Sequence, residues 1–130
     1  GFYDGVKKIQ FEKNLIHQSK HCLLDLYNCD VLKLNDESFL RCTINNAAKK
    51  ANARVLNLIS HKFEPQGVTA IALLSESHLS IHTWPESHYA AIDIFTCGQN
   101  MHPDIASNYL IKALMAQEHM LRFINRNHPS

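Results

Sequence analysis

Hydrophobic and polar residues alternate along much of the chain, and this alternation predicts several β-strands. In residues 78–84, HLSIHTW, one side of a strand would carry Leu79, Ile81 and Thr83, and the other side His78, Ser80, His82 and Trp84. Alternation or a short hydrophobic run predicts further strands at residues 20–29, 53–63, 68–74, 89–97 and 119–125. Residues 68–74, VTAIALL, are hydrophobic almost throughout, so we expect this strand near the centre of a sheet.

Three-and-four spacing of hydrophobic residues predicts two helices between these strands. The first would follow a capping residue at Asn35 or Asp36 and bury a stripe of Leu40, Ile44, Ala47, Ala48 and Ala51. The second would open at Pro103 and Asp104 and bury a stripe of Ile105, Tyr109, Ala113 and Leu114. These elements indicate an α+β fold, a two-layer sandwich whose antiparallel sheet carries helices on one face.

Composition and charge are typical of one globular domain. Of 130 residues, 45% are hydrophobic and 19% are charged, so the chain can bury a core. Residues 1–18 show weak periodicity, and we expect an N-terminal extension there and a single domain at 19–130. The net charge of +1 gives no electrostatic reason to expect a nucleic-acid or membrane partner.

The sequence shows no membrane-spanning stretch and no signal-peptide pattern. Its four cysteines, at positions 22, 29, 42 and 97, lack C-x-x-C spacing. We therefore expect reduced thiols in a cytoplasmic protein.

The polar side of residues 78–84 has three interpretations. It can be a solvated strand face, a metal site, or part of a reactive site. On a strand, His78 and His82 would lie roughly 13 Å apart at about 3.3 Å per residue, too far to share one metal ion. The metal interpretation is therefore disfavoured, and we expect no metal.

The third interpretation concerns the Glu76–Ser77 peptide bond. A serine hydroxyl can attack the carbonyl carbon before it and form an ester, and a base can then remove the serine α-proton. Elimination and loss of ammonia leave an N-terminal pyruvoyl group. This chemistry requires a nearby imidazole and a hydroxyl or backbone donor, and His82 and Thr69 are candidates. Composition and spacing alone do not choose among the three interpretations.

A resemblance favours the third interpretation. The string SESHLSIHTWPE, followed by YAAIDIFTCG, resembles the prokaryotic S-adenosylmethionine decarboxylase family in its short bacterial and archaeal form. The resemblance covers about residues 19–116 and includes KHCLLDLYNCD and HKFEPQGVTA. It implies a carboxy-lyase proenzyme that cleaves itself between Glu76 and Ser77, giving a β chain (1–76) and an α chain (77–130).

The resemblance also implies a role for individual residues during self-cleavage. Ser77 would become the pyruvoyl group, which forms a Schiff base with the substrate. His82 would remove the Ser77 α-proton, and Thr69 would support the cyclic intermediate with its hydroxyl. Thr69 stands where relatives more often have serine, and its restricted side chain is expected to slow cleavage.

During turnover, the resemblance implies that Cys97 protonates the substrate carbon after carbon dioxide has left. Glu86 would hold the ribose hydroxyls, and Phe63 would stack on adenine. His88 stands where relatives often have glycine, so we expect an altered turn after Glu86. The product would be the aminopropyl donor for spermidine synthesis, and the enzyme would be a homodimer with active sites near its interface.

Two alternatives differ from this interpretation. The same pyruvoyl scaffold could decarboxylate ornithine or arginine, although Phe63 and Glu86 favour a nucleoside substrate. The chain could also be an uncleaved, non-catalytic homologue that acts as a binding partner.

Overall fold

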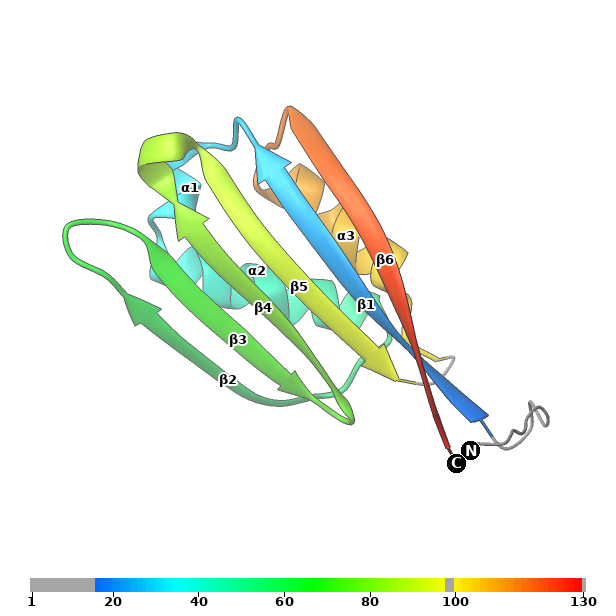
Figure 1. Ribbon diagram of the computed structural model, residues 1–130. Coiled ribbons are helices and arrows are strands. Elements are labelled where there is room, and N and C mark those ends of the chain that lie inside the picture. The colour runs from blue at the N-terminus through cyan, green and yellow to red at the C-terminus, as the bar shows by residue number, and fades with distance from the viewer. Residues whose placement is uncertain (1–15, 98–99, 130) are drawn as a thin grey trace.

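The computed structural model describes residues 16–97 and 100–129, in which six strands form one antiparallel sheet. The strands lie side by side in the order β2-β3-β4-β5-β1-β6 (Figure 1). In chain order the elements are β1 (Ile16–Tyr27), α1 (Val31–Leu34), α2 (Glu37–Lys50), β2 (Val55–Lys62), β3 (Val68–Leu74), β4 (Ser77–Trp84), the 3₁₀ helix η2 (Pro85–Ser87), β5 (Tyr89–Cys97), α3 (Pro103–Ala113) and β6 (Glu118–Pro129).

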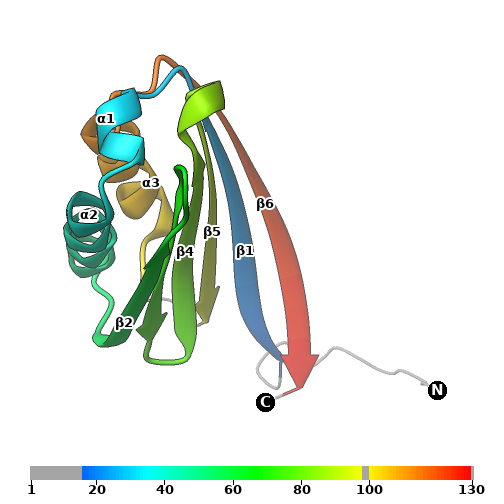
Figure 2. The ribbon, with the colours of Figure 1, turned by 90° about the vertical axis from the view of Figure 1, so that its left-hand side faces the viewer.

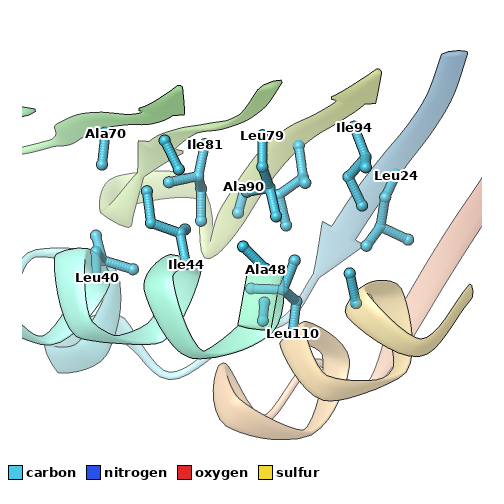
Figure 3. Packing of buried hydrophobic residues seen from close by; sticks show 14 of the residues in the cluster. Leu24, Leu40, Ile44, Ala48, Ala70, Leu79, Ile81, Ala90, Ile94 and Leu110 are labelled. Atoms are coloured by element: carbon cyan, nitrogen blue, oxygen red, sulfur yellow. The ribbon is translucent and has the colours of Figure 1, made fainter. Parts of the chain in front are cut away.

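Helices α2 and α3 lie against one face of the sheet, which we call the covered face (Figure 2). Leucine and isoleucine side chains from the strands and helices meet there and are almost completely buried (Figure 3). Complete burial of one such side chain contributes about 1.5–3 kcal/mol relative to exposure. The predicted α+β class, an antiparallel sheet with helices on one face, is confirmed.

The ends of the helices follow from their capping residues. The Asp36 carboxylate accepts a hydrogen bond from the Phe39 amide at 3.0 Å, so Asp36 is the N-cap of α2. Pro103 occupies the first turn of α3, where its missing amide hydrogen costs nothing. Both helices begin within the predicted positions. Among the helices that the structure describes, none has the length and hydrophobicity needed to cross a bilayer.

Four details of the predicted elements were wrong. Helix α1 was missed, because four residues are too few to show a period. Strand β3 is not central, since β4 and β5 occupy the middle of the sheet. In α3 the buried residues are Ala106, Ser107 and Leu110, whereas Ile105 is exposed. Strand β1 begins at Ile16, so residues 16–18 belong to the sheet; residues 1–15 of the expected extension lie outside the described residues.

The second face of the sheet, which we call the open face, carries the side of each strand that the helices do not cover. Cross-strand pairing places the odd-numbered residues of β1 and β5 and the even-numbered residues of β4 on this face. Several large hydrophobic side chains are exposed there: Ile59, Leu73, Trp84, Met120 and Ile124. A face of this composition is suited to contact with another surface.

Candidate active site

The Glu76–Ser77 bond lies in the tight turn between β3 and β4. Leu74 pairs with Ser77, which leaves only Ser75 and Glu76 to form the turn. Glu76 has φ +62°, a left-handed conformation that costs a residue with a side chain about 1–3 kcal/mol. Ser77 itself is buried, being 9% exposed. The peptide bond predicted to be cleaved is therefore held in a strained turn by two paired strands.

Thr69 and His82 face each other across β3 and β4 on the open face. They are direct partners in the β-sheet register, and Thr69 Oγ1 lies 2.9 Å from His82 Nδ1. The restricted side-chain rotation of threonine helps to fix this contact. The structure therefore brings together the predicted hydroxyl and the predicted imidazole.

Ser77 and His82 are not brought together within one chain. They are five residues apart on β4, which at about 3.3 Å per residue separates them by roughly 16 Å. The odd spacing also places them on opposite faces of the sheet. Ser77 shares the covered face with Leu79 and Ile81, whereas His82 lies on the open face.

Cys97 lies at the same end of the sheet as Ser77. It is the last residue of β5, and the pairing of His78 with Phe95 places it beside the start of β4. Its side chain is partly exposed on the open face. Ser19, its partner on β1, donates a hydrogen bond to Cys97 Sγ at 3.6 Å.

Phe63 and Glu86 lie at the opposite end of the sheet, near Thr69 and His82. Phe63 follows β2; its amide donates to the Gly67 carbonyl at 2.8 Å, and its ring is 46% exposed. Glu86 is exposed in η2, directly after β4. Both predicted substrate-binding side chains are therefore accessible, and both are remote from Ser77 along the strands.

His88 ends η2 in the left-handed conformation, with φ 55° and ψ 33°. Glycine adopts this conformation without cost, which explains why glycine suits this position. The His88 carbonyl accepts a hydrogen bond from the Cys29 amide at 3.0 Å. This bond ties the turn that bears Glu86 to the loop after β1. A shallow pocket beside it is lined by Asn28, Cys29, Asp30, His88, Met115 and Gln117.

These positions define two ends of the sheet. We call the end with Ser77 and Cys97 the cleavage end, and the end with Thr69 and His82 the imidazole end. The cleavage end carries the bond predicted to be cleaved and the Cys97 thiol. The imidazole end carries a base paired with a hydroxyl, together with an exposed aromatic ring and an exposed acid.

Sequence reasoning missed the residues that β1 contributes to the open face. The rings of His21, His78 and Phe95 form a cluster, with each histidine centroid 5.7 Å from the phenyl centroid and the two histidine centroids 6.2 Å apart. His21 Nε2 is buried and has no hydrogen-bond partner among the described residues. These residues become neighbours only because β1 pairs with β5, and no local pattern in the sequence predicts that pairing.

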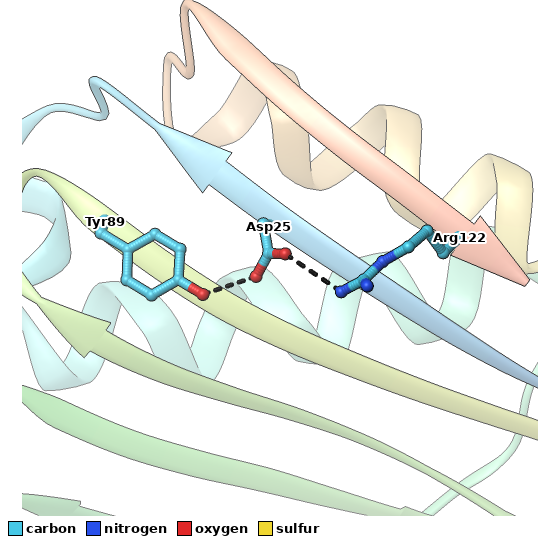
Figure 4. Close-up of polar contacts among 3 residues, drawn as sticks. All are labelled: Asp25, Tyr89 and Arg122. Atoms are coloured by element: carbon cyan, nitrogen blue, oxygen red, sulfur yellow. Dashed lines mark hydrogen bonds and ion pairs between the residues drawn. The ribbon is translucent and has the colours of Figure 1, made fainter.

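A chain of polar groups crosses β5, β1 and β6 on the open face (Figure 4). The Tyr89 hydroxyl donates to Asp25 Oδ1 at 2.5 Å, and Arg122 Nη2 lies 3.6 Å from Asp25 Oδ2. Burial, followed by the hydrogen bond to Asp25 and the negative charge of Asp25, raises the pKa of Tyr89 to about 12. Tyr89 therefore stays a neutral donor at physiological pH.

Two other thiols, those of Cys22 and Cys29, are buried in the hydrophobic core. Burial raises the pKa of Cys29 to about 11, and burial is also the largest cause of the raised pKa of Cys22. Thiols of this kind are poor nucleophiles and proton donors at neutral pH. Cys97, on the open face, is accessible by comparison.

Comparison with known proteins gives a consistent result. Residues 20–127 match the family described as S-adenosylmethionine decarboxylase. The chain is 60% identical over 111 residues to an S-adenosylmethionine decarboxylase proenzyme of Prochlorococcus marinus, covering 85% of this chain and 89% of that protein. A proenzyme of the same name from Halalkalibacterium halodurans is 48% identical over 97 residues, covering 75% of this chain and 76% of that protein.

Solved structures resemble the fold. The crystal structure of the adenosylmethionine decarboxylase from Aquifex aeolicus superimposes with a TM-score of 0.72 at 33% identity, covering 87% of this chain and 90% of that chain. The Trypanosoma brucei AdoMetDC-delta26 monomer gives a TM-score of 0.60 at 14% identity, covering 78% of this chain and 44% of that chain. The second likeness concerns the fold alone.

Proposed function

This chain belongs to the S-adenosylmethionine decarboxylase family and decarboxylates S-adenosylmethionine, and we propose that it does so with a pyruvoyl group made from its own Ser77. The observation that carries this proposal is the position of Ser77. It begins β4, directly after the left-handed Glu76, so the bond proposed to be cleaved lies in the strained two-residue turn between β3 and β4. The residues present therefore suit a group formed by cleavage at this bond.

In the proposed cleavage, Ser77 Oγ attacks the Glu76 carbonyl carbon, the carbon–nitrogen bond breaks, and an ester forms. His82 then removes the Ser77 α-proton, and the Glu76 carboxylate leaves from Cβ. Addition of water and loss of ammonia convert the resulting dehydroalanine into the pyruvoyl group. The Thr69–His82 contact of 2.9 Å supports this step, because a hydroxyl bonded to Nδ1 orients the imidazole ring.

During turnover, a pyruvoyl carbonyl supplies a sink for the electrons left on the substrate α-carbon when the carboxylate departs as carbon dioxide. Cys97 then gives its thiol proton to that carbon. The exposed Phe63 ring would stack on adenine, and the Glu86 carboxylate would accept hydrogen bonds from the ribose hydroxyls. The product would donate aminopropyl groups in spermidine synthesis. The four unpaired thiols suit our further proposal that the reaction is cytoplasmic.

We propose a homodimer in which each active site combines the two ends from different protomers. Within one chain, Ser77 and His82 are too far apart for proton transfer. A two-fold axis that stacks the open faces and reverses the strand direction would place one protomer's imidazole end over the other's cleavage end. There the Glu76–Ser77 bond lies in a turn at the edge of the sheet, with Glu76 exposed, so it can be reached although the Ser77 side chain points to the covered face. The exposed Ile59, Leu73 and Ile124 side chains would be buried by this contact.

Mass spectrometry of the denatured protein tests the cleavage. We expect two fragments, residues 1–76 and 77–130, the second beginning with pyruvoyl, and one intact chain for Ser77→Ala. Release of carbon dioxide should be measured with S-adenosylmethionine, ornithine and arginine in parallel. A wild-type chain that stays intact after long incubation would contradict the pyruvoyl proposal.

Coexpression of two inactive variants tests the shared site. A dimer of Ser77→Ala with His82→Ala contains one site that has both native side chains, so chains carrying His82→Ala should be cleaved. Each variant expressed alone should stay intact. If the mixture also stays intact although mixed dimers can be isolated by two affinity tags, the two ends do not meet across the interface.

A further inference from the structure

Ser19 holds the sulfur of Cys97. The two residues are partners in the pairing of β1 with β5, although 78 positions separate them in the sequence. Ser19 is only 3% exposed, and its hydroxyl donates to Cys97 Sγ at 3.6 Å. Among the described residues, it is the Ser19 hydroxyl that donates a hydrogen bond to Cys97 Sγ. A buried donor directed at a reactive sulfur has consequences for its chemistry.

We propose that Ser19 is a positioning residue for Cys97, orienting the thiol at the cleavage end and stabilising the thiolate that forms after proton transfer. This inference depends on the role proposed above for Cys97. In the transfer, the S–H bond breaks, a C–H bond forms at the substrate α-carbon, and the S–H electron pair stays on sulfur. Cys97 then regains a proton from water, while Ser19 stays protonated throughout.

The surroundings of Cys97 contain charged and titratable groups that could act on it as well. On β1 and β4 these are His21 and His78, which lie diagonal to Cys97 across the sheet. Arg126 on β6 lies opposite Ser19, and its guanidinium is 5.9 Å from the Phe95 ring centroid. Glu76 lies in the neighbouring turn. All of them stay unchanged when Ser19 is substituted, so a difference caused by Ser19→Ala reports on the hydroxyl.

The hydrogen bond should favour the thiolate over the thiol. A hydrogen bond to a charged acceptor is stronger than one between neutral groups, so the preference is expected to be on the order of 10-fold. Loss of the hydroxyl should therefore slow the alkylation of Cys97 at neutral pH about 10-fold. It should also slow the proton transfer by a similar factor.

The test uses the processed enzyme and three variants: Ser19→Ala, Ser19→Thr and Ser107→Ala. Iodoacetamide labelling of Cys97 at neutral pH, resolved by peptide mass spectrometry, gives the rate of alkylation without requiring turnover. Ser107→Ala is the matched control, because it removes a buried hydroxyl 3.7 Å from another thiol, Cys22, on the covered face. We expect the alkylation rate of Cys97 to fall in Ser19→Ala, to return in Ser19→Thr, and to stay unchanged in Ser107→Ala.

Turnover gives the second measurement. In Ser19→Ala, kcat should fall about 10-fold with KM changed less than about twofold, because the contact acts after the substrate has bound. More of the pyruvoyl groups should be converted to alanine per turnover, since the proton reaches the wrong carbon more often. A Ser19→Ala enzyme with the wild-type labelling rate and kcat would overturn the proposal.

A Cys97→Ala enzyme distinguishes a failure of the proposal for Ser19 from a failure of the proposed function. Wild-type turnover in Cys97→Ala would remove the role of Cys97, and the role of Ser19 with it. Impaired turnover in Cys97→Ala, together with a wild-type Ser19→Ala enzyme, would overturn the assignment of Ser19 alone.

Discussion

The two ends of the sheet hold their reacting groups by different means. At the imidazole end, Thr69 and His82 are 13 positions apart in sequence and are paired by a single hairpin. At the cleavage end, Ser19 and Cys97 are 78 positions apart and meet only because β1 lies beside β5. The first pair can form as soon as β3 and β4 associate, whereas the second requires most of the sheet. If the proposed roles hold, one reaction depends on both local and long-range structure.

The largest expected effects come from His82→Ala, which removes the base of the imidazole end. A positioned base typically contributes about 10²–10⁴-fold, so self-cleavage should slow by this factor. The chain should accumulate as the ester, and hydroxylamine should cleave it between residues 76 and 77. Denaturing gels over time provide the measurement, with the exposed His119→Ala as control. Normal cleavage in His82→Ala would show that this end has no part in processing.

The counterpart at the cleavage end is Cys97→Ala, which should affect the later step. Self-cleavage should still proceed, since the thiol is needed only after carbon dioxide has left. Turnover of S-adenosylmethionine should fall by about 10²–10⁴-fold. A matched control is Cys42→Ala, which removes an exposed thiol from α2. If His82→Ala and Cys97→Ala both block the same step, the proposal that the two ends act at different steps is wrong.

A smaller effect is expected from Thr69→Val, which keeps the side-chain shape and removes the hydroxyl. One hydrogen bond contributes about 0.5–1.5 kcal/mol, so cleavage should slow about 2-fold to 10-fold. Thr69→Ser keeps the hydroxyl and should cleave at least as fast as the wild type. The rates are measured by quenched mass spectrometry of newly purified precursor. Equal rates for valine and threonine would show that the 2.9 Å contact has no role in processing.

The smallest effect concerns Tyr89, whose hydroxyl donates to Asp25 on the open face. Its folded pKa, about 12, lies above the usual value of 10.0, so the folded state binds this proton more tightly than the unfolded state. The contribution of Tyr89 to stability is therefore complete below pH 10 and is lost as the pH rises toward 12. Urea midpoints measured from pH 8 to 11 should fall less steeply in Tyr89→Phe. Parallel slopes would show that this proton is not linked to folding.

The parts of the molecule that could be predicted from the sequence depend on residues that are close together in the sequence. Alternation between residues 68 and 97 predicted three consecutive strands, and their hairpins fix which residues face each other. For that reason, the contact between Thr69 and His82 follows from the local pattern. The Asp36 cap likewise depends on a bond to Phe39, only three residues away.

Other features depend on packing between distant segments. The buried stripe of α3 includes Ala106 rather than Ile105, and α3 packs against a surface of α2 that carries the small residues Ala47 and Ala48. Hydrophobicity alone favours isoleucine, whereas the close approach of two helices favours alanine. The Ser19–Cys97 contact is similarly absent from any local pattern, because it depends on the pairing of β1 with β5.

Because of the order of the strands in the sheet, the proposed cleavage would change refolding from a reaction of one chain into an association of two. Residues 1–76 carry β1, β2 and β3, while residues 77–130 carry β4, β5 and β6. In the sheet, β4 and β5 lie between β3 and β1, and β1 lies between β5 and β6, so the two fragments interleave. The folded protein can therefore survive the cut, but unfolding then releases two separate chains. Recovery becomes a concentration-dependent association, so folding before cleavage is favoured over folding after it.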